Sequence, residues 1–144
     1  MENIKELRTR FLNDTVEFYS ADPVRLRATV PRPLPKVPDF MGCVYSPTSS
    51  SPGCAIGRHI EDKTLCKKWD EKSVPVQFIF DDLPINLKEL GKHFLRLVQA
   101  LHDNKENWNE AGLTELGKNK IDNIKTLIEN DSFHPDNGQY DYTK

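Results

Sequence analysis

The sequence has no apolar run that approaches the roughly 20 residues a transmembrane helix needs. Its first residues, MENIKELRTRF, are charged and amphipathic and lack the apolar segment of a signal peptide. The chain has only three cysteines, an odd number that disfavours a fully disulfide-paired secreted scaffold. These absences predict a protein of a reducing cytosol that has no contact with a membrane.

A surplus of one charge sign is also missing. The chain has 20 Lys and Arg against 22 Asp and Glu, which gives a net charge of −2. Bulk attraction to nucleic acid is therefore not expected, although a local basic segment would still attract it. The sequence also lacks a phosphate-binding glycine loop, a helix-turn-helix signature and the aromatic pair of an RNA-recognition motif.

What the sequence does have is enough material for one core. A length of 144 residues suits a single domain, and seven Phe, four Tyr and two Trp supply large apolar side chains. We expect the globular domain to span residues 1–129. The polar, acidic tail over 130–144 is expected to be poorly ordered unless another surface docks it.

Several segments have the apolar spacing of helices with one buried face. In residues 4–19 apolar side chains recur every three or four positions, and the following Asp22-Pro23 pair ends the pattern. The same reasoning predicts helices over 61–72, 86–103 and 112–130. In the last of these Thr114 is a candidate N-cap, and Gly117 weakens the first turn.

A β-hairpin is predicted next to these helices. The short apolar runs 41–46 and 53–60 flank the Ser/Pro-rich loop PTSSSP, and small residues at Gly53, Ala55 and Gly57 allow close backbone approach. Residues 73–84 fit either a buried strand or a short helix. The predicted fold class is α+β: one mostly helical domain with a small hairpin packed on three to four helices.

A proline-rich basic arm spans residues 23–38 and contains five of the ten prolines. Proline fixes φ and removes amide donors, so this segment is predicted to be extended, neither a helix nor a central strand. One interpretation is a plain connector. The other is a semi-rigid strap on a polyanion or an acidic protein surface, which would bind through Arg25, Arg27, Arg32 and Lys36.

Two further residues are candidates for anion binding. Arg58 and His59 follow Gly57, and we expect them to project from the end of the hairpin. Together with the basic arm they would form a surface for a nucleotide or an RNA phosphate.

One set of residues has the composition of a structural zinc site: Cys43, Cys54, His59 and Cys66. Its spacing, C-x10-C-x4-H-x6-C, lacks the short C-x2-C knuckle that places two ligands on one turn. The favoured interpretation is therefore that the cysteines are small buried side chains and that the protein has no metal or cofactor. Nothing nearby activates a cysteine, so no catalytic residue and no enzyme activity are predicted.

Three stretches together resemble a family of small phage and prophage proteins: CVYSPTSSSPGCAIGRHI (43–60), LPINLKELGKHFLRLVQALHD (83–103) and NWNEAGLTELG (107–117). Their common pattern is a Cys-x-Tyr strand, a Cys-Ala-hydrophobic-Gly strand, and a helix that ends in Leu-His-Asp before Asn-Trp and Gly-Leu-Thr-x-x-Gly. The basic arm and the tail fall outside it. The resemblance implies a phage accessory protein, and such proteins are often similar to inhibitors of host defence.

The function that this resemblance implies is non-enzymatic counter-defence in the bacterial cytosol. An anti-CRISPR-like protein would bind a host effector nuclease or its guide-RNA complex, with RNA contact through the basic arm. Two alternatives remain open. One is a sponge that traps a defence signalling nucleotide with Arg58, His59 and the basic arm. The other is a small zinc-stabilised RNA-binding module.

Overall fold

The computed structural model describes residues 3–21, 29–31, 41–43, 45, 53–72 and 79–133. The α-helices in these ranges are α1 (Ile4–Ser20), α3 (Lys63–Lys72), α4 (Ile85–Lys88), α5 (Lys92–Asp103) and α6 (Glu115–Asn130). Short 3-10 turns are η1 (Gly57–His59), η3 (Phe80–Asp82) and η4 (Lys105–Asn107). None of the helices in the described ranges is long and apolar enough to span a membrane.

Two small antiparallel sheets accompany the helices. In the first, β1 (Thr29–Pro31) pairs with β2 (Met41–Cys43), and in the second β3 (Trp108–Asn109) pairs with β4 (Gly112–Leu113). The fold is thus α+β and mostly helical, as the sequence predicts.

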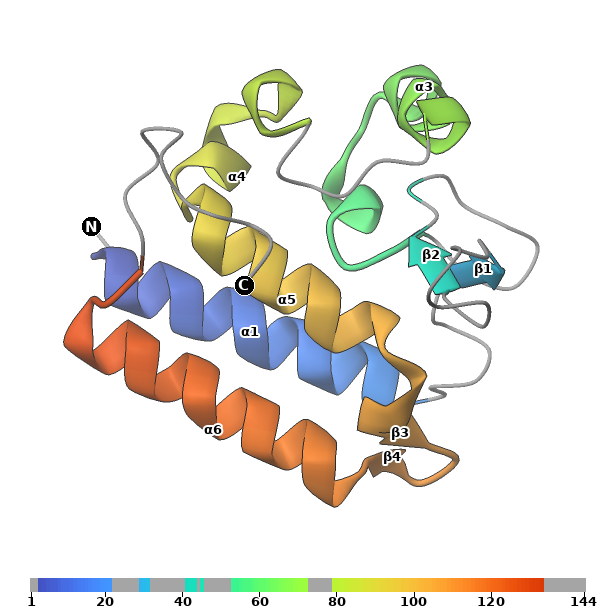
Figure 1. The fold of residues 1–144 in the computed structure, drawn as a ribbon. Helices are drawn as coiled ribbons and strands as arrows, with labels where there is room; N and C mark the ends of the chain where they lie inside the picture. The colour runs from blue at the N-terminus through green and yellow to red at the C-terminus, as the bar shows by residue number, and fades with distance from the viewer. Residues whose placement is uncertain are drawn as a thin grey trace.

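Helices α1, α5 and α6 lie side by side and form the body of the molecule (Figure 1). The start of α1 is set by Asn3, whose side chain accepts a hydrogen bond from the Glu6 amide at 2.9 Å. Leu12 and Tyr19 on its inner face are fully buried. The helix predicted over 4–19 is therefore confirmed, with its buried stripe facing the other two helices.

The single helix predicted over 86–103 is wrong, because the chain breaks into α4 and α5 at Gly91. Gly91 has φ 93°, a backbone conformation that only glycine adopts readily. The break frees the carbonyl oxygen of Leu90, and the buried Arg8 donates a hydrogen bond to it from Nε at 2.8 Å. Apolar periodicity does not reveal the break, since Leu87 and Phe94 on either side of it are both buried.

The hairpin predicted between 41–46 and 53–60 is also wrong. Strand β2 pairs with β1 instead, in the register Val30↔Gly42, so its partner comes from the basic arm, which is extended at these residues. Residues 53–60 form turns that wrap the backbone of Tyr45. A Cβ atom at Gly53 or Gly57 would overlap the Tyr45 carbonyl, so both positions require glycine.

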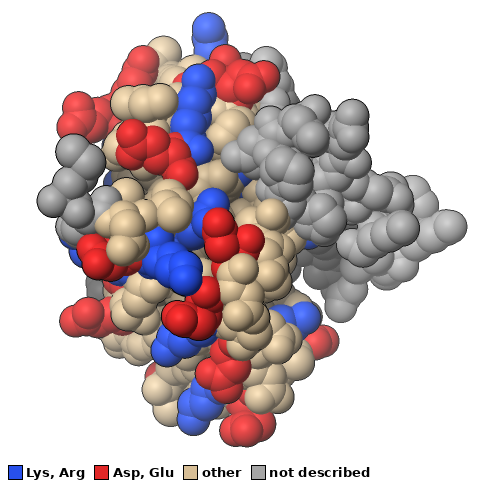
Figure 2. Space-filling model, turned by 90° about the vertical axis from the view of Figure 1, so that its left-hand side faces the viewer, with Lys and Arg blue, Asp and Glu red and all other residues tan. Residues whose placement is uncertain are grey.

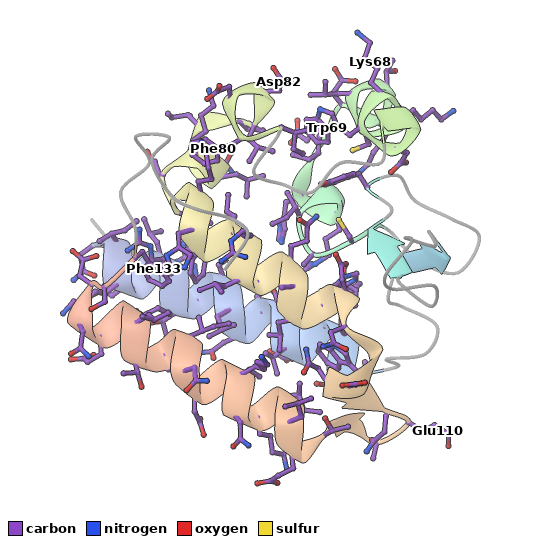
Figure 3. All side chains as sticks on the ribbon, in the orientation of Figure 1. Lys68, Trp69, Phe80, Asp82, Glu110 and Phe133 are labelled. Atoms are coloured by element: carbon purple, nitrogen blue, oxygen red, sulfur yellow. The ribbon has the colours of Figure 1, made fainter. Side chains whose placement is uncertain are left out.

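Helix α3 begins two residues later than the predicted 61–72 segment and covers the turns around Tyr45. Trp69 is buried and points inward from α3, whereas Lys68 points away from the molecule (Figure 3). The Trp69 ring meets the Tyr45 ring edge-on at 5.3 Å. Of the ambiguous segment 73–84, residues 73–78 lie outside the described ranges, and Phe80–Asp82 form the turn η3.

Helix α6 has the predicted N-cap, because Thr114 Oγ1 accepts a hydrogen bond from the Gly117 amide at 3.2 Å. Close packing requires glycine at position 117, because a Cβ on Gly117 would overlap the carbonyl oxygen of Asn107. The helix ends at Asn130, and the capping residue Asp131 has φ 48° and pairs with Arg8 at 3.2 Å. Phe133 then packs edge-on against Phe94 at 5.5 Å. The tail is thus docked up to Phe133, and residues 134–144 lie outside the described ranges.

Candidate binding cleft on helix α1

A cleft of about 320 Å³ lies between α1, α4 and η1. Four apolar residues line it, of which Leu87 and Leu90 are buried and Leu7 and Phe11 are partly buried. The polar residues that line it are Arg10, Asp14, His59, Asn86 and Glu89. A concave apolar surface with a few polar groups around it is the usual form of a binding site.

Helical spacing places these side chains together. Leu7, Phe11 and Asp14 are separated by four and three positions, so they share one face of α1. On the opposite wall, Asn86 and Glu89 are three positions apart and share a face of the short α4. The break at Gly91 sets α4 apart from α5 as a separate short helix, which forms this second wall.

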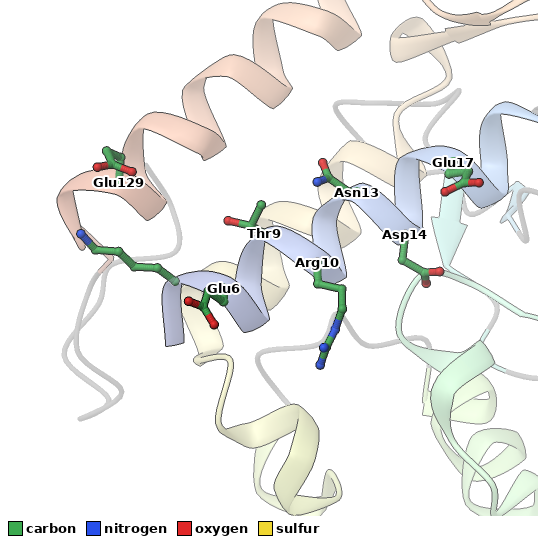
Figure 4. Close-up of a pocket in the computed structure, with 8 residues that line it drawn as sticks. Glu6, Thr9, Arg10, Asn13, Asp14, Glu17 and Glu129 are labelled. Atoms are coloured by element: carbon green, nitrogen blue, oxygen red, sulfur yellow. The ribbon is translucent and has the colours of Figure 1, made fainter. Parts of the chain in front are cut away.

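A second, larger hollow of about 640 Å³ continues along α1 towards Glu129 of α6 (Figure 4). It shares Arg10 and Asp14 with the cleft, and its other lining residues are all polar: Lys5, Glu6, Thr9, Asn13, Glu17 and Glu129. We call the two hollows together the α1 face. Five carboxylates and two cationic side chains line the α1 face, an excess of negative charge.

The molecule seen from the side on which α1 begins carries charges of both signs (Figure 2). Lys and Arg side chains alternate with Asp and Glu over this view, and the described part of it has no extended region of one sign (Figure 2). Charges of both signs over this end of the molecule (Figure 2) are consistent with the small net charge of −2 for the whole chain.

His59 forms part of the cleft as a neutral side chain. Its ring lies 4.9 Å from the Phe11 ring, and burial together with the neighbouring Arg58 lowers its pKa to about 4. The Nε2 atom is buried and has no hydrogen-bond partner among the described residues. His59 is therefore uncharged at neutral pH and does not attract an anion by charge.

Arg58 makes its contacts within the protein. Its guanidinium forms an ion pair with Asp14 and lies over the Phe18 ring, 4.3 Å from the centroid. The prediction that Arg58 and His59 project from a hairpin end is wrong, because both belong to η1 and pack against α1. An anion would have to compete with Asp14 for this guanidinium.

The other predicted anion-binding residues lie outside the described ranges. These are Arg25, Arg27, Arg32 and Lys36 of the basic arm. Binding of a polyanion by the arm therefore stays a prediction.

The zinc set is not assembled in the described part of the chain. Cys54 is disulfide-bonded, so its sulfur is not available as a thiolate ligand, and Cys66 is a free buried thiol whose pKa is raised by burial. The side chain of Cys43 is not among those described, and His59 stacks on Phe11. No group of three metal-ligating side chains occurs among the described residues. Disulfides are rare in a reducing cytosol, so the disulfide of Cys54 gives no support to the predicted cytosolic location. That location stays a prediction.

His102 has a carboxylate beside it, as a catalytic histidine would, but it is fully buried. His102 Nδ1 lies 2.7 Å from Asp103 Oδ1, and its ring meets the Tyr19 ring at 4.5 Å. The Tyr19 hydroxyl donates a hydrogen bond to the Gly53 carbonyl at 2.8 Å, and burial raises its pKa. This cluster connects α1, α5 and the turns at 53–60, and a substrate has no access to His102.

Three residues of α4 were missed by sequence reasoning. Asn86 and Glu89 are exposed at the cleft, and their side chains make no hydrogen bond or ion pair with the described residues. Ile85, 72% exposed, lies four positions before Glu89 and so on the same side of α4. The signal that would have found them is the short segment bounded by Pro84 and Gly91, since these two residues isolate one helical turn.

Comparison with protein-family models, with curated proteins and with solved structures finds no match. The resemblance to phage-encoded proteins therefore stays a prediction. The geometry of the α1 face is what supports a function.

Proposed function

We propose that the protein acts by binding another protein through the α1 face. The observation that carries this proposal is the cleft itself, where an apolar lining and polar side chains without internal partners, Asn86 and Glu89, occur together. The exposed Ile85 lies next to the cleft-lining Asn86 on α4. Protein interfaces have the same composition, with an apolar centre, a polar rim and a few anchor residues.

The chemistry of the described residues favours binding over catalysis. His102 and Cys66 are both buried, and burial raises the pKa of the Cys66 thiol, so neither side chain meets a substrate as a reactive group. The groups at the cleft, in contrast, are suited to contacts: a neutral imidazole, an amide and a carboxylate.

As the identity of the partner we propose a host CRISPR effector nuclease or its guide-RNA complex, so that the protein would counter host defence. The phage-family resemblance supports this choice, and so does charge. A protein that holds nucleic acid presents Lys and Arg side chains, and the negative excess of the α1 face is complementary to such a surface.

The two alternatives gain no support from the described geometry. A nucleotide sponge needs available cations, whereas Arg58 is paired with Asp14 and His59 is neutral. A zinc-stabilised module would need Cys54 as a thiolate, and this residue is disulfide-bonded.

The test uses tagged protein in cells that carry a CRISPR system. Wild-type protein should capture the effector, identified by mass spectrometry, and restore plaque formation by a targeted phage. Ile85→Asp should lose both effects, because it places a charge on the exposed apolar position of α4 that precedes the cleft-lining Asn86, without touching the core.

The matched control is Leu116→Asp, which alters another exposed apolar residue, 40% exposed, on the first turn of α6. It should retain capture and plaque formation. Failure of the wild-type protein to capture an effector, or equal loss in both variants, would refute the proposed function.

A further inference from the structure

We infer that the cleft between α1 and α4 takes a cationic side chain with an apolar stem, a lysine or an arginine of the bound protein. This inference rests on the proposed function and names the chemistry that the partner must supply. It follows from the charges, the apolar lining and the neutral wall of the cleft.

The charged groups at the cleft differ in whether they are already paired. Asp14 forms an ion pair with Arg58, and Arg10 already interacts with another group of the chain. Glu89 is exposed and forms no ion pair with the described residues. The carboxylate of Glu89 is thus available to a cation, and the Asn86 amide oxygen beside it is a second acceptor.

The lining of the cleft suits the methylene stem of a basic side chain. Leu7, Leu87 and Leu90 offer an aliphatic surface, and the Phe11 ring adds an aromatic face. Lysine and arginine bury their stems on such surfaces while the charged head stays at the rim. A cation close to an aromatic ring gains a further attraction.

An anion fits this cleft less well. His59 is neutral at pH 7, and the two nearby cations are already engaged, Arg58 with Asp14 and Arg10 with another group of the chain. An incoming phosphate or carboxylate would also be repelled by Glu89. A purely apolar side chain would occupy the lining but would leave Glu89 and Asn86 unused. The cleft therefore favours a cationic head at its rim and an apolar stem at its base.

The experiment uses small probes that imitate the two parts of a basic side chain. n-Butylguanidinium, butyrate and 1-butanol have similar stems and differ in charge. Each is titrated into the full chain while the methyl signals of Leu7 and Leu87 and the ring signals of His59 are followed by NMR. Butylguanidinium should shift these signals at lower concentration than butanol, and butyrate should bind most weakly.

Two matched variants locate the charge. Glu89→Gln should weaken butylguanidinium binding about fivefold, the upper range for an exposed ion pair, and leave butanol unchanged. Glu110→Gln alters an exposed carboxylate on the β3–β4 turn, far from the cleft in Figure 3, and should change neither. Equal binding of all three probes, no shift with any probe, or no effect of Glu89→Gln would overturn the inference.

The same protein separates failure of the inference from failure of the proposed function. If effector capture depends on Ile85 but butylguanidinium does not bind, the inference is wrong and the proposed function stands. If butylguanidinium binds with the expected dependence on Glu89 and no effector is captured, the cation site stands and the proposed function is wrong.

Discussion

The two walls of the cleft differ in whether their polar side chains already have partners within the protein. On the wall formed by α1 and the adjoining turn η1, Asp14 is paired with Arg58, and the amide of Gly57 in η1 donates a hydrogen bond to Cys54 Sγ at 3.4 Å. On the α4 wall, the side chains of Asn86 and Glu89 bind nothing among the described residues. Substitutions in the first wall should therefore change the free energy of unfolding, and substitutions in the second should change binding.

The largest effect is expected at Gly57. Gly57→Ala should lower the free energy of unfolding by about 3 kcal/mol, because the new Cβ would overlap three backbone atoms of the buried Tyr45. Urea denaturation measures this loss. Gly112→Ala is the control: among the described residues a Cβ there meets only the Ser20 side chain at 3.8 Å, so its cost is the backbone strain at φ +123°, about 1–2 kcal/mol. A larger effect at Gly112 would contradict the packing around Tyr45.

The second effect concerns pH and His59. Its pKa of about 4 in the folded protein lies below the ordinary value of 6.5, so the unfolded chain takes up the proton first as pH falls. Stability should therefore decrease between about pH 6.5 and pH 4, by about 1–2 kcal/mol once partial exposure of the ring is allowed for.

The measurement is urea denaturation of wild-type protein and of His59→Gln at several pH values. The difference in unfolding free energy between the two should be constant above pH 7 and change steadily from pH 6.5 to pH 4. A difference that does not vary over this range would show that His59 titrates equally in the folded and unfolded states.

A smaller effect is expected for Arg58. Arg58→Met keeps the apolar stem over the Phe18 ring but removes the cation from Asp14 and from the ring. The expected loss is about 1 kcal/mol, since the Asp14 carboxylate is 54% exposed and water screens the pair. The melting temperature should fall for Arg58→Met and recover in part for Arg58→Lys.

The smallest effect on stability is expected on the other wall. Glu89→Gln should change the free energy of unfolding by less than about 0.5 kcal/mol, because an exposed side chain without partners is replaced by one of the same shape. Melting temperatures of Glu89→Gln and Arg58→Met measured under the same conditions test this difference. If Glu89→Gln destabilised the protein as much as Arg58→Met, the α4 wall would be structural and not free for binding.

Local signals predict the helices of this protein well. Apolar spacing places the ends of α1, α3 and α6 within three residues of the observed ones, because each helix buries a single stripe. The Thr114 cap follows from the side-chain chemistry of threonine at a helix start. The break at Gly91 was missed because both helix fragments bury leucines at the same spacing. The cleft was not predicted either, because Asn86 and Glu89 form one of its walls only when α4 is a helix separate from α5.

The sequence by itself determined the mostly helical α+β class and the buried faces of the helices, because both depend on residues close in the chain. The tertiary structure decided the partner of β2, the close packing of Gly57 against Tyr45, and the pairing of Arg58 with Asp14. Each of these joins positions that are distant in the sequence, and no local pattern records such contacts. It also decided which polar groups were left over for a partner, since a side chain is free only when folding has not already used it.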